Sequence, residues 1–187
     1  MIARVIALFP RDRADFYWTC FSQSEQTAFL LPCLRRAPQS NHAFPWSRKV
    51  LEANKCLFNR VPCDNDFEKA FARFLENADD IRTFAKLPQP FGFSIDYTDA
   101  GVNLRSYYPD FVAVDKNEVH WLIETKGMES AEVGHKDLAA TNWCENASAL
   151  TKIKWKYVKV PQKGFEVLQP ARLGDLAALG APTGFES

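Results

Sequence analysis

The sequence predicts a domain of the α/β class, and three observations support this prediction. An amphipathic helical pattern begins near residue 64, a strand-rich stretch follows it, and a second helical pattern precedes one more strand. The chain has 187 residues, of which 47% are hydrophobic. That length and composition suit one folded domain with its own core.

Residues 1–63 are the least regular part of the sequence. Prolines interrupt the aromatic and apolar residues, and no helical or strand period is sustained. We expect an irregular lead-in here, or a piece of a larger assembly.

The first clear helix begins after Asp64 or Asn65, either of which can cap it. Apolar side chains then recur with the spacing of one helical face, which predicts a helix that packs against the core. The apolar positions are Phe67, Ala70, Phe71, Phe74 and Leu75.

Short β-type runs follow at residues 81–87 and 91–97, with prolines between them and a turn at residues 98–101. The next two runs, 106–114 and 119–126, flank the polar turn Asp115-Lys116-Asn117-Glu118. This arrangement predicts a β-hairpin, with Gly127 ending its second strand.

A second helix is predicted over residues 135–147, followed by a strand over residues 152–158 that alternates lysines with larger side chains. From Pro170 onward the chain is rich in alanine, glycine and proline, with a weak helical turn near residues 173–179. We expect residues 170–187 to be a loosely held tail.

Charge and hydropathy exclude several classes of protein. Basic and acidic residues number 23 each, so the formal net charge is zero and any contact with nucleic acid must be a local patch. No apolar run approaches the roughly 20 residues of a membrane-spanning helix, and no cleavage-site pattern follows the apolar start. We therefore expect a cytoplasmic protein without membrane contact.

The five cysteines indicate reduced thiols rather than a disulfide framework, because their number is odd and none forms a Cys-x-x-Cys pair. Zinc ligation by four of them is an alternative, although their spacing matches no common zinc finger. These four are Cys20, Cys33, Cys56 and Cys63.

The hairpin carries the residues that point to chemistry. With the turn centred between Lys116 and Asn117, Asp110 lies opposite Ile123, within one residue of Glu124. Glu124 and Lys126 project from the same face of their strand. Two carboxylates suit a hard cation such as Mg²⁺, and a neighbouring lysine can orient water or neutralise a phosphate, so the pattern predicts phosphodiester hydrolysis.

Tyr108-Pro109-Asp110, followed fourteen positions later by Glu124-Thr125-Lys126, closely resembles the signature of PD-(D/E)xK nucleases. More narrowly, residues 65 to about 165 look like the nuclease domain at the C-terminus of the restriction (Res) subunit of type III restriction enzymes. The resemblance implies a nuclease domain over residues 64–169 with a restriction-endonuclease-like fold, in which a central mixed β-sheet is flanked by helices. It also implies cleavage of DNA that depends on Mg²⁺, for which Mn²⁺ can substitute.

In this family an acidic residue from the first core helix joins the site, and the matching candidate here is Glu68, which a helical wheel places beside the apolar stripe. The resemblance thus implies Asp110, Glu124 and Glu68 as metal ligands, and the same three with Lys126 as catalytic residues. The chain has no Gly-rich Walker loop. We therefore expect that a helicase or translocase, and a methyltransferase or specificity subunit, are supplied by other chains or by a longer parent chain.

Four further lysines are candidates for contact with DNA. Lys136 begins the second helix and can touch a phosphate, or it is an ordinary exposed lysine. Lys152, Lys154 and Lys156 share one face of the last strand, where they can follow a DNA backbone or protect a sheet edge from aggregation.

The leading hypothesis is a nuclease that cuts DNA. Two alternatives stay open: a noncatalytic module for DNA binding or assembly that keeps the fold, and a nuclease that acts on RNA or branched DNA, because such a site reads phosphate rather than base.

Overall fold

The computed structural model describes residues 4–7, 43–46, 49–57, 60–87, 93–127 and 133–178. Two short antiparallel pairs come first, and a four-stranded sheet with three helices follows. In chain order the elements are β1 (Arg4–Ala7), β2 (Ala43–Trp46), β3 (Lys49–Glu52), β4 (Arg60–Cys63), α2 (Asp66–Asn77), β5 (Ile81–Lys86), β6 (Ile95–Thr98), β7 (Leu104–Tyr107), β8 (Phe111–Asp115), β9 (His120–Lys126), α3 (Val133–Thr151), β10 (Trp155–Pro161), α4 (Gln162–Leu168) and the 3₁₀ helix η2 (Leu173–Ala178).

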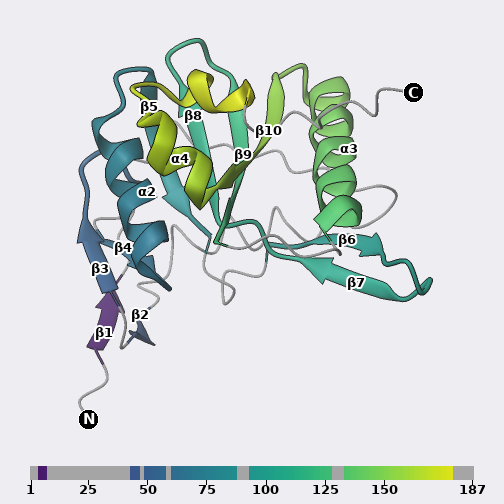
Figure 1. The fold of residues 1–187 in the computed structure, drawn as a ribbon, viewed down its shortest axis with the longest axis horizontal. Coiled ribbons are helices and arrows are strands. Elements are labelled where there is room, and N and C mark those ends of the chain that lie inside the picture. Colours follow the sequence, from purple (N-terminus) through teal and green to yellow (C-terminus); the bar gives the residue numbers. More distant parts are fainter. Residues whose placement is uncertain are drawn as a thin grey trace.

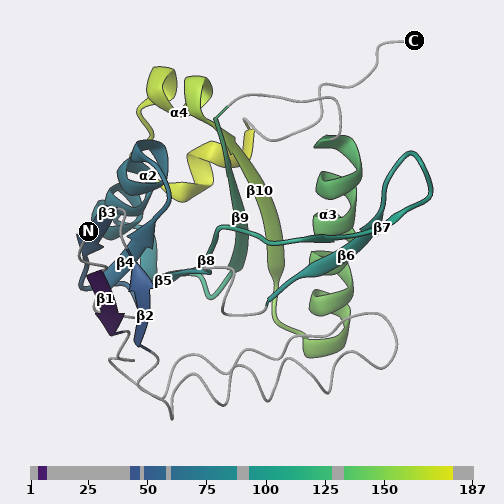
Figure 2. The ribbon, with the colours of Figure 1, turned by 90° about the horizontal axis from the view of Figure 1, so that it is seen from below.

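The four-stranded sheet has the order β10-β9-β8-β5. Strand β10 runs parallel to β9, whereas β9 with β8 and β8 with β5 are antiparallel, so the sheet is mixed. Helices α2 and α4 cover one face and α3 covers the other (Figures 1 and 2). This architecture confirms the predicted fold class.

Aromatic side chains fill both interfaces between helices and sheet. On the α2 face the ring of Phe71 packs on those of Phe111 and Phe165, with centroids 5.5 and 5.6 Å apart. On the α3 face Trp143 packs on Trp155 at 5.0 Å. Rings of this size dominate the hydrophobic free energy of a core, so they fix both helices to the sheet.

Helix α2 begins as the sequence predicts. Asn65 is the N-cap, and its side chain accepts a hydrogen bond from the Glu68 backbone N–H at 2.8 Å. The buried residues of the helix include Phe67, Phe71 and Leu75, which belong to the predicted apolar stripe. Glu68 is buried with them. The N-cap and the apolar face of the helix therefore place an acidic side chain in the interior.

The β8–β9 hairpin is confirmed, but its register differs by one residue from the prediction. Phe111 pairs with Ile123, and the Asp110 N–H donates to the Ile123 carbonyl at 3.1 Å. The loop is centred on Asn117 because Glu118 adopts a left-handed conformation with φ of 61°, as in a three-residue hairpin loop. The paired register ends at Phe111, so Asp110 lies just before the ladder, with its carboxylate on Thr125.

The predicted strand at residues 106–114 is wrong as a single strand. The chain forms β7 up to Tyr107 and β8 from Phe111, and these belong to different sheets. Strand β7 pairs with β6 in a hairpin that crosses beside α3 (Figure 2). The last strand begins at Trp155 rather than at Lys152, because α3 continues to Thr151 and Lys152 then takes a left-handed conformation with φ of 62°.

Both ends of the described chain contribute more to the core than expected. In the expected irregular lead-in, β3 and β4 pair with each other, and Val61 and Cys63 are fully buried. In the expected loose tail, Leu173 and Leu176 are fully buried, and the Leu173 N–H donates to Asp80. Residues 179–187 of that tail lie outside the described residues.

Two further expectations concern thiols and membranes. Burial raises the pKa of Cys63 and of Cys144 to about 12, which keeps both thiols protonated. Cys20 and Cys33, which the zinc alternative requires, lie outside the described residues. None of the helices in the described part of the chain combines the length and apolar character needed to cross a membrane.

Candidate functional site

Asp110 lies just before β8, where three donors hold its carboxylate. Oδ2 accepts hydrogen bonds from the backbone N–H and the hydroxyl of Thr125, at 2.8 and 2.6 Å. Oδ1 lies 3.1 Å from Nζ of Lys86, the last residue of β5. The aspartate is therefore oriented from two strands at once.

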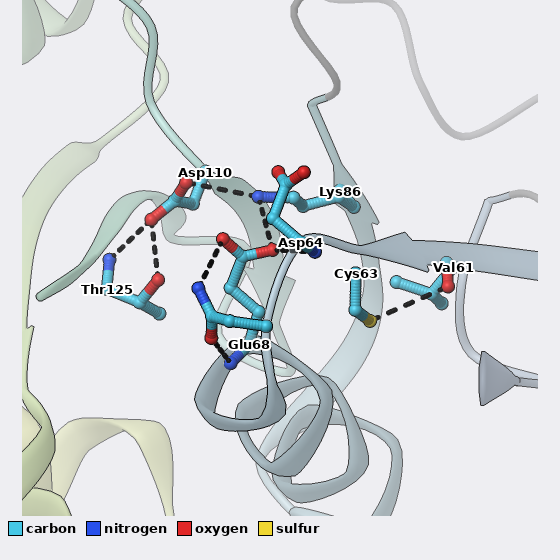
Figure 3. A network of polar contacts seen from close by, with 8 residues as sticks. Val61, Cys63, Asp64, Glu68, Lys86, Asp110 and Thr125 are labelled. Atoms are coloured by element: carbon cyan, nitrogen blue, oxygen red, sulfur yellow. Dashed lines mark hydrogen bonds and ion pairs between the residues drawn. The ribbon is translucent and has the colours of Figure 1, made fainter. Parts of the chain in front are cut away.

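Lys86 joins Asp110 to helix α2. Its ammonium lies 3.0 Å from Oε2 of Glu68, and Figure 3 shows it between the two carboxylates. The Lys86 side chain is 3% exposed and that of Glu68 is 7% exposed. Charged side chains this deeply buried need partners, because the cost of removing an unpaired charge from water is several kcal/mol or more.

The charges of this cluster shift the pKa values of its members. Burial lowers the pKa of Lys86, but the negative charges of Asp110 and Glu68 raise it, and the net direction is upward. Lys86 is therefore a cation. Burial raises the pKa of Glu68, while the ammonium of Lys86 opposes that rise.

Glu124 has a different environment, although it is the neighbour of Asp110 across the hairpin. Its Oε2 accepts a hydrogen bond from the Tyr107 hydroxyl at 3.1 Å. Burial and the negative charge of Asp110 raise the pKa of Glu124 to about 8, while Lys126 and Lys136 lower it only in part. Near neutral pH this carboxyl group has little compensation for a negative charge.

Further polar side chains lie on the α3 side, next to Glu124 in the sheet. Lys159 of β10 is the register partner of Glu124. Its ammonium lies 3.0 Å from Oδ2 of Asp137 in α3, and the Tyr157 hydroxyl donates to Oδ1 of the same aspartate at 2.8 Å. Asp137 thus has two partners and fixes the first half of α3 against β10.

The predicted site residues separate into two groups. Asp110, Glu124 and Lys126 lie near one another at the end of the β8–β9 hairpin, whereas Glu68 lies across the ammonium of Lys86 from Asp110. Among the described residues, no group of three or more His, Cys, Asp or Glu side chains lies together as a metal site. The three predicted ligands are therefore not arranged as one set.

The pair Asp110 and Glu124 fits a divalent cation by its chemistry. Both donors are hard carboxylate oxygens, and Mg²⁺ is commonly bound by one or two carboxylates together with water and substrate phosphate. Burial and the negative charge of Asp110 disfavour the ionised form of Glu124. A bound cation would favour that ionised form.

The candidate DNA-binding lysines lie at different distances from this pair. Lys136 is close enough to lower the pKa of Glu124. Lys152 and Lys154 are exposed and precede β10, so only Lys156 lies in the strand. Its ammonium lies over the Trp121 ring, 5.0 Å from the centroid.

Sequence reasoning missed Lys86, Thr125 and Tyr107. A signal existed for Lys86, because a lysine at the end of the apolar run Phe84-Ala85 breaks the strand pattern in the same way as Asp110 does. For Thr125 and Tyr107 the residue types are ordinary in strands, and only the tertiary contacts distinguish them.

A comparison with protein families agrees with this geometry. A family model described as an endonuclease domain matches residues 54–161, which is more than half of the chain. No curated protein and no solved structure matches the chain.

Proposed function

The chain belongs to this endonuclease-domain family, and from that premise we propose that it is a DNA endonuclease module that requires Mg²⁺. One observation carries the proposal. Asp110 and Glu124 lie close together at the end of the β8–β9 hairpin, where burial and the negative charge of Asp110 raise the pKa of Glu124 to about 8.

Each residue of the proposed site has a distinct role. Asp110 and Glu124 would hold Mg²⁺, with Mn²⁺ as a substitute, and the bound ion would supply positive charge beside the phosphate. Lys126 is half-buried on the same face of β9 as Glu124. Its ammonium can orient the attacking water or stabilise the charge that develops on the phosphate.

We also propose that this module works in a restriction system resembling type III enzymes. The support is the spacing of Pro109-Asp110 and Glu124-Thr125-Lys126. The lack of a Walker loop in these 187 residues is a departure from those enzymes. A helicase or translocase and a methyltransferase or specificity subunit would then act with it, on other chains or in a longer parent chain. Lys136 is the candidate nearest to the site for contact with a DNA phosphate.

The proposal is tested by nicking of supercoiled plasmid with and without Mg²⁺. Asp110→Asn and Lys126→Met should abolish Mg²⁺-dependent nicking. Asp79→Asn and Lys116→Met are matched controls, because both side chains are exposed, and they should cut as the wild type does. Equal nicking by all five proteins would disprove the assignment.

One observation favours a second candidate, a noncatalytic module for DNA binding or assembly. The cation that contacts Asp110 and Glu68 in the structure is Lys86. Calorimetry separates the candidates, because a catalytic site must bind Mg²⁺ or Mn²⁺ and a noncatalytic module need not. Substrates of RNA and branched DNA, run beside the plasmid, decide the substrate class.

A further inference from the structure

The ion cluster of Glu68, Lys86 and Asp110 suggests a role that neither the motif nor the family match assigns. We propose that Lys86 is a positioning residue: it takes Glu68 as its counter-ion, holds Asp110 in place, and leaves Glu68 outside the set of metal ligands. This inference rests on the proposed metal site at Asp110 and Glu124.

The first argument is the orientation of Asp110. Thr125 donates twice to Oδ2, and Lys86 contacts Oδ1 at 3.1 Å. Donors at both oxygens fix the rotation of the carboxylate about its side-chain bonds. Lys86 supplies the part of this restraint that comes from outside the hairpin, because it belongs to β5.

The second argument is the rigidity of Lys86 itself. Its side chain is 3% exposed, and its ammonium lies 5.0 Å from the centroid of the Phe111 ring. That ring packs against Phe71 of α2. A lysine this deeply buried, beside an aromatic ring and paired with two carboxylates, has little freedom to change its conformation, so it is a fixed cation.

The third argument is that the oxygens of Glu68 already have partners. Oε2 accepts from the Asp64 N–H at 2.8 Å and pairs with Lys86, while Oε1 accepts from Asn65 Nδ2 at 3.2 Å. The Asn65 side chain in turn accepts from the Glu68 N–H, so the two residues cap α2 reciprocally. Ligation of a metal through Oε1 would compete with the Asn65 donor, and ligation through Oε2 would compete with Lys86 and the Asp64 N–H.

Charge leads to the same assignment. The charges of Glu68 and Lys86 offset each other, so a divalent cation would meet the charge of Asp110 and that of Glu124, which releases its proton when a cation binds. A variant that removes both Glu68 and Lys86 charges therefore keeps the net charge of the cluster, whereas each single variant changes it by one. This property gives a charge-matched control.

The experiment measures Mn²⁺ affinity by calorimetry on the full chain without DNA, for the wild type, Glu68→Gln, Lys86→Met, the double variant and Asp110→Asn. We expect Glu68→Gln to bind about tenfold more weakly, because it leaves the positive charge of Lys86 beside Asp110 uncompensated. Lys86→Met removes that charge, which favours binding, and also the restraint on Oδ1 of Asp110, which disfavours it, so it should gain less than about tenfold. The double variant should stay within about threefold of the wild type, and Asp110→Asn should lose about 100-fold or more.

If Glu68 is a ligand, Glu68→Gln and the double variant lose affinity equally, and that result overturns the inference. The double variant keeps the test valid even if Lys86→Met alone does not fold. Thermal unfolding without metal gives a second readout that is independent of the proposed function. Lys86→Met should lower the Tm by roughly 10 °C, and adding Glu68→Gln should recover about half of that loss; no recovery would exclude the pairing, even in a chain that binds no Mn²⁺.

Discussion

At the end of the β8–β9 hairpin, the carboxylates on the α2 side and on the α3 side have different electrostatic environments. On the α2 side, Glu68 and Asp110 share the buried ammonium of Lys86 at 3.0 and 3.1 Å. On the α3 side, Glu124 has a hydrogen bond from Tyr107 and a pKa raised to about 8. On the α2 side a buried cation of the protein pairs with the carboxylates, whereas on the α3 side burial and the charge of Asp110 disfavour the ionised form of Glu124.

This difference indicates which groups maintain the fold and which are available for chemistry. A buried, paired charge contributes orientation, and removing one partner leaves the other unpaired at a large cost. A carboxyl group with a strongly raised pKa near a strand end is instead a candidate for binding a cation or a proton. The predictions below test this division, from the largest expected effect to the smallest.

The largest effect is expected for the stability of the Lys86→Met variant. The substitution leaves the buried Glu68 and Asp110 without their cation, and breaking a buried pair in this way costs about 3–5 kcal/mol. Urea unfolding should show that loss in the free energy of unfolding. Lys116→Met, in the exposed turn, is the control and should change it by less than about 0.5 kcal/mol.

The second effect concerns catalysis, with little change in stability. Lys126 is half-buried beside Glu124 and lowers the pKa of that residue. Removing a group that stabilises charge in the transition state lowers kcat by about 100- to 1000-fold, or about 2.7–4 kcal/mol. Single-turnover cleavage by Lys126→Met should show this loss with substrate affinity changed much less, whereas an equal loss in both would indicate a binding role.

The third effect is a dependence of stability on pH, caused by Glu124 on the α3 side. The pKa of Glu124 is about 8 in the folded chain, above its ordinary 4.5. The folded state therefore binds the proton more tightly, and this contribution is complete below pH 4.5 and is lost as the pH rises through 8. Without metal, stability from this group should fall over that range by less than the roughly 5 kcal/mol that the full shift corresponds to, because the Glu124 side chain is partly exposed to solvent.

Glu124→Gln is the matched variant for this pH effect, because it keeps the size of the side chain and cannot ionise. Its unfolding free energy should lose that part of the decline with pH. A wild type and a Glu124→Gln variant with the same pH profile would show that Glu124 is not the group responsible. Mn²⁺ should weaken the decline in the wild type, because a bound cation favours the ionised carboxylate.

The sequence was sufficient for features set by local pattern. The N-cap Asn65, the apolar stripe of α2 and the β8–β9 hairpin all follow from residue type and spacing. The predicted register of the hairpin differs from the observed one by one residue, because the left-handed conformation of Glu118 adds a residue to the loop. A glutamate does not favour that conformation, so the residue type does not predict it. A slip of one residue changes which side chain faces Asp110.

The ion cluster of Glu68, Lys86 and Asp110 was harder to predict than the pair on the hairpin, for a physical reason. Asp110 and Glu124 lie fourteen residues apart on one hairpin, so local pairing brings them together. Lys86 and Glu68 meet only when α2 packs on the sheet, and β5 pairs with β8 across a separation that includes the whole β6–β7 hairpin. A sequence without tertiary contacts shows a lysine at a strand end, and does not show its partners.

The smallest effect is expected at β10, which is an edge strand of the four-stranded sheet as far as the structure describes it. Lys156 lies over the Trp121 ring at 5.0 Å and is exposed, so Lys156→Ala should cost about 0.5–1 kcal/mol of stability from the lost cation–π contact. If Lys156 also contacts DNA, the salt dependence of DNA binding should fall by about one phosphate contact. Lys154→Ala is the control, because its side chain is equally exposed and precedes the strand. If neither variant changes the salt dependence and only Lys156→Ala loses stability, Lys156 protects the sheet edge rather than binding DNA. The DNA contacts would then lie at the end of the hairpin, near Lys126 and Lys136.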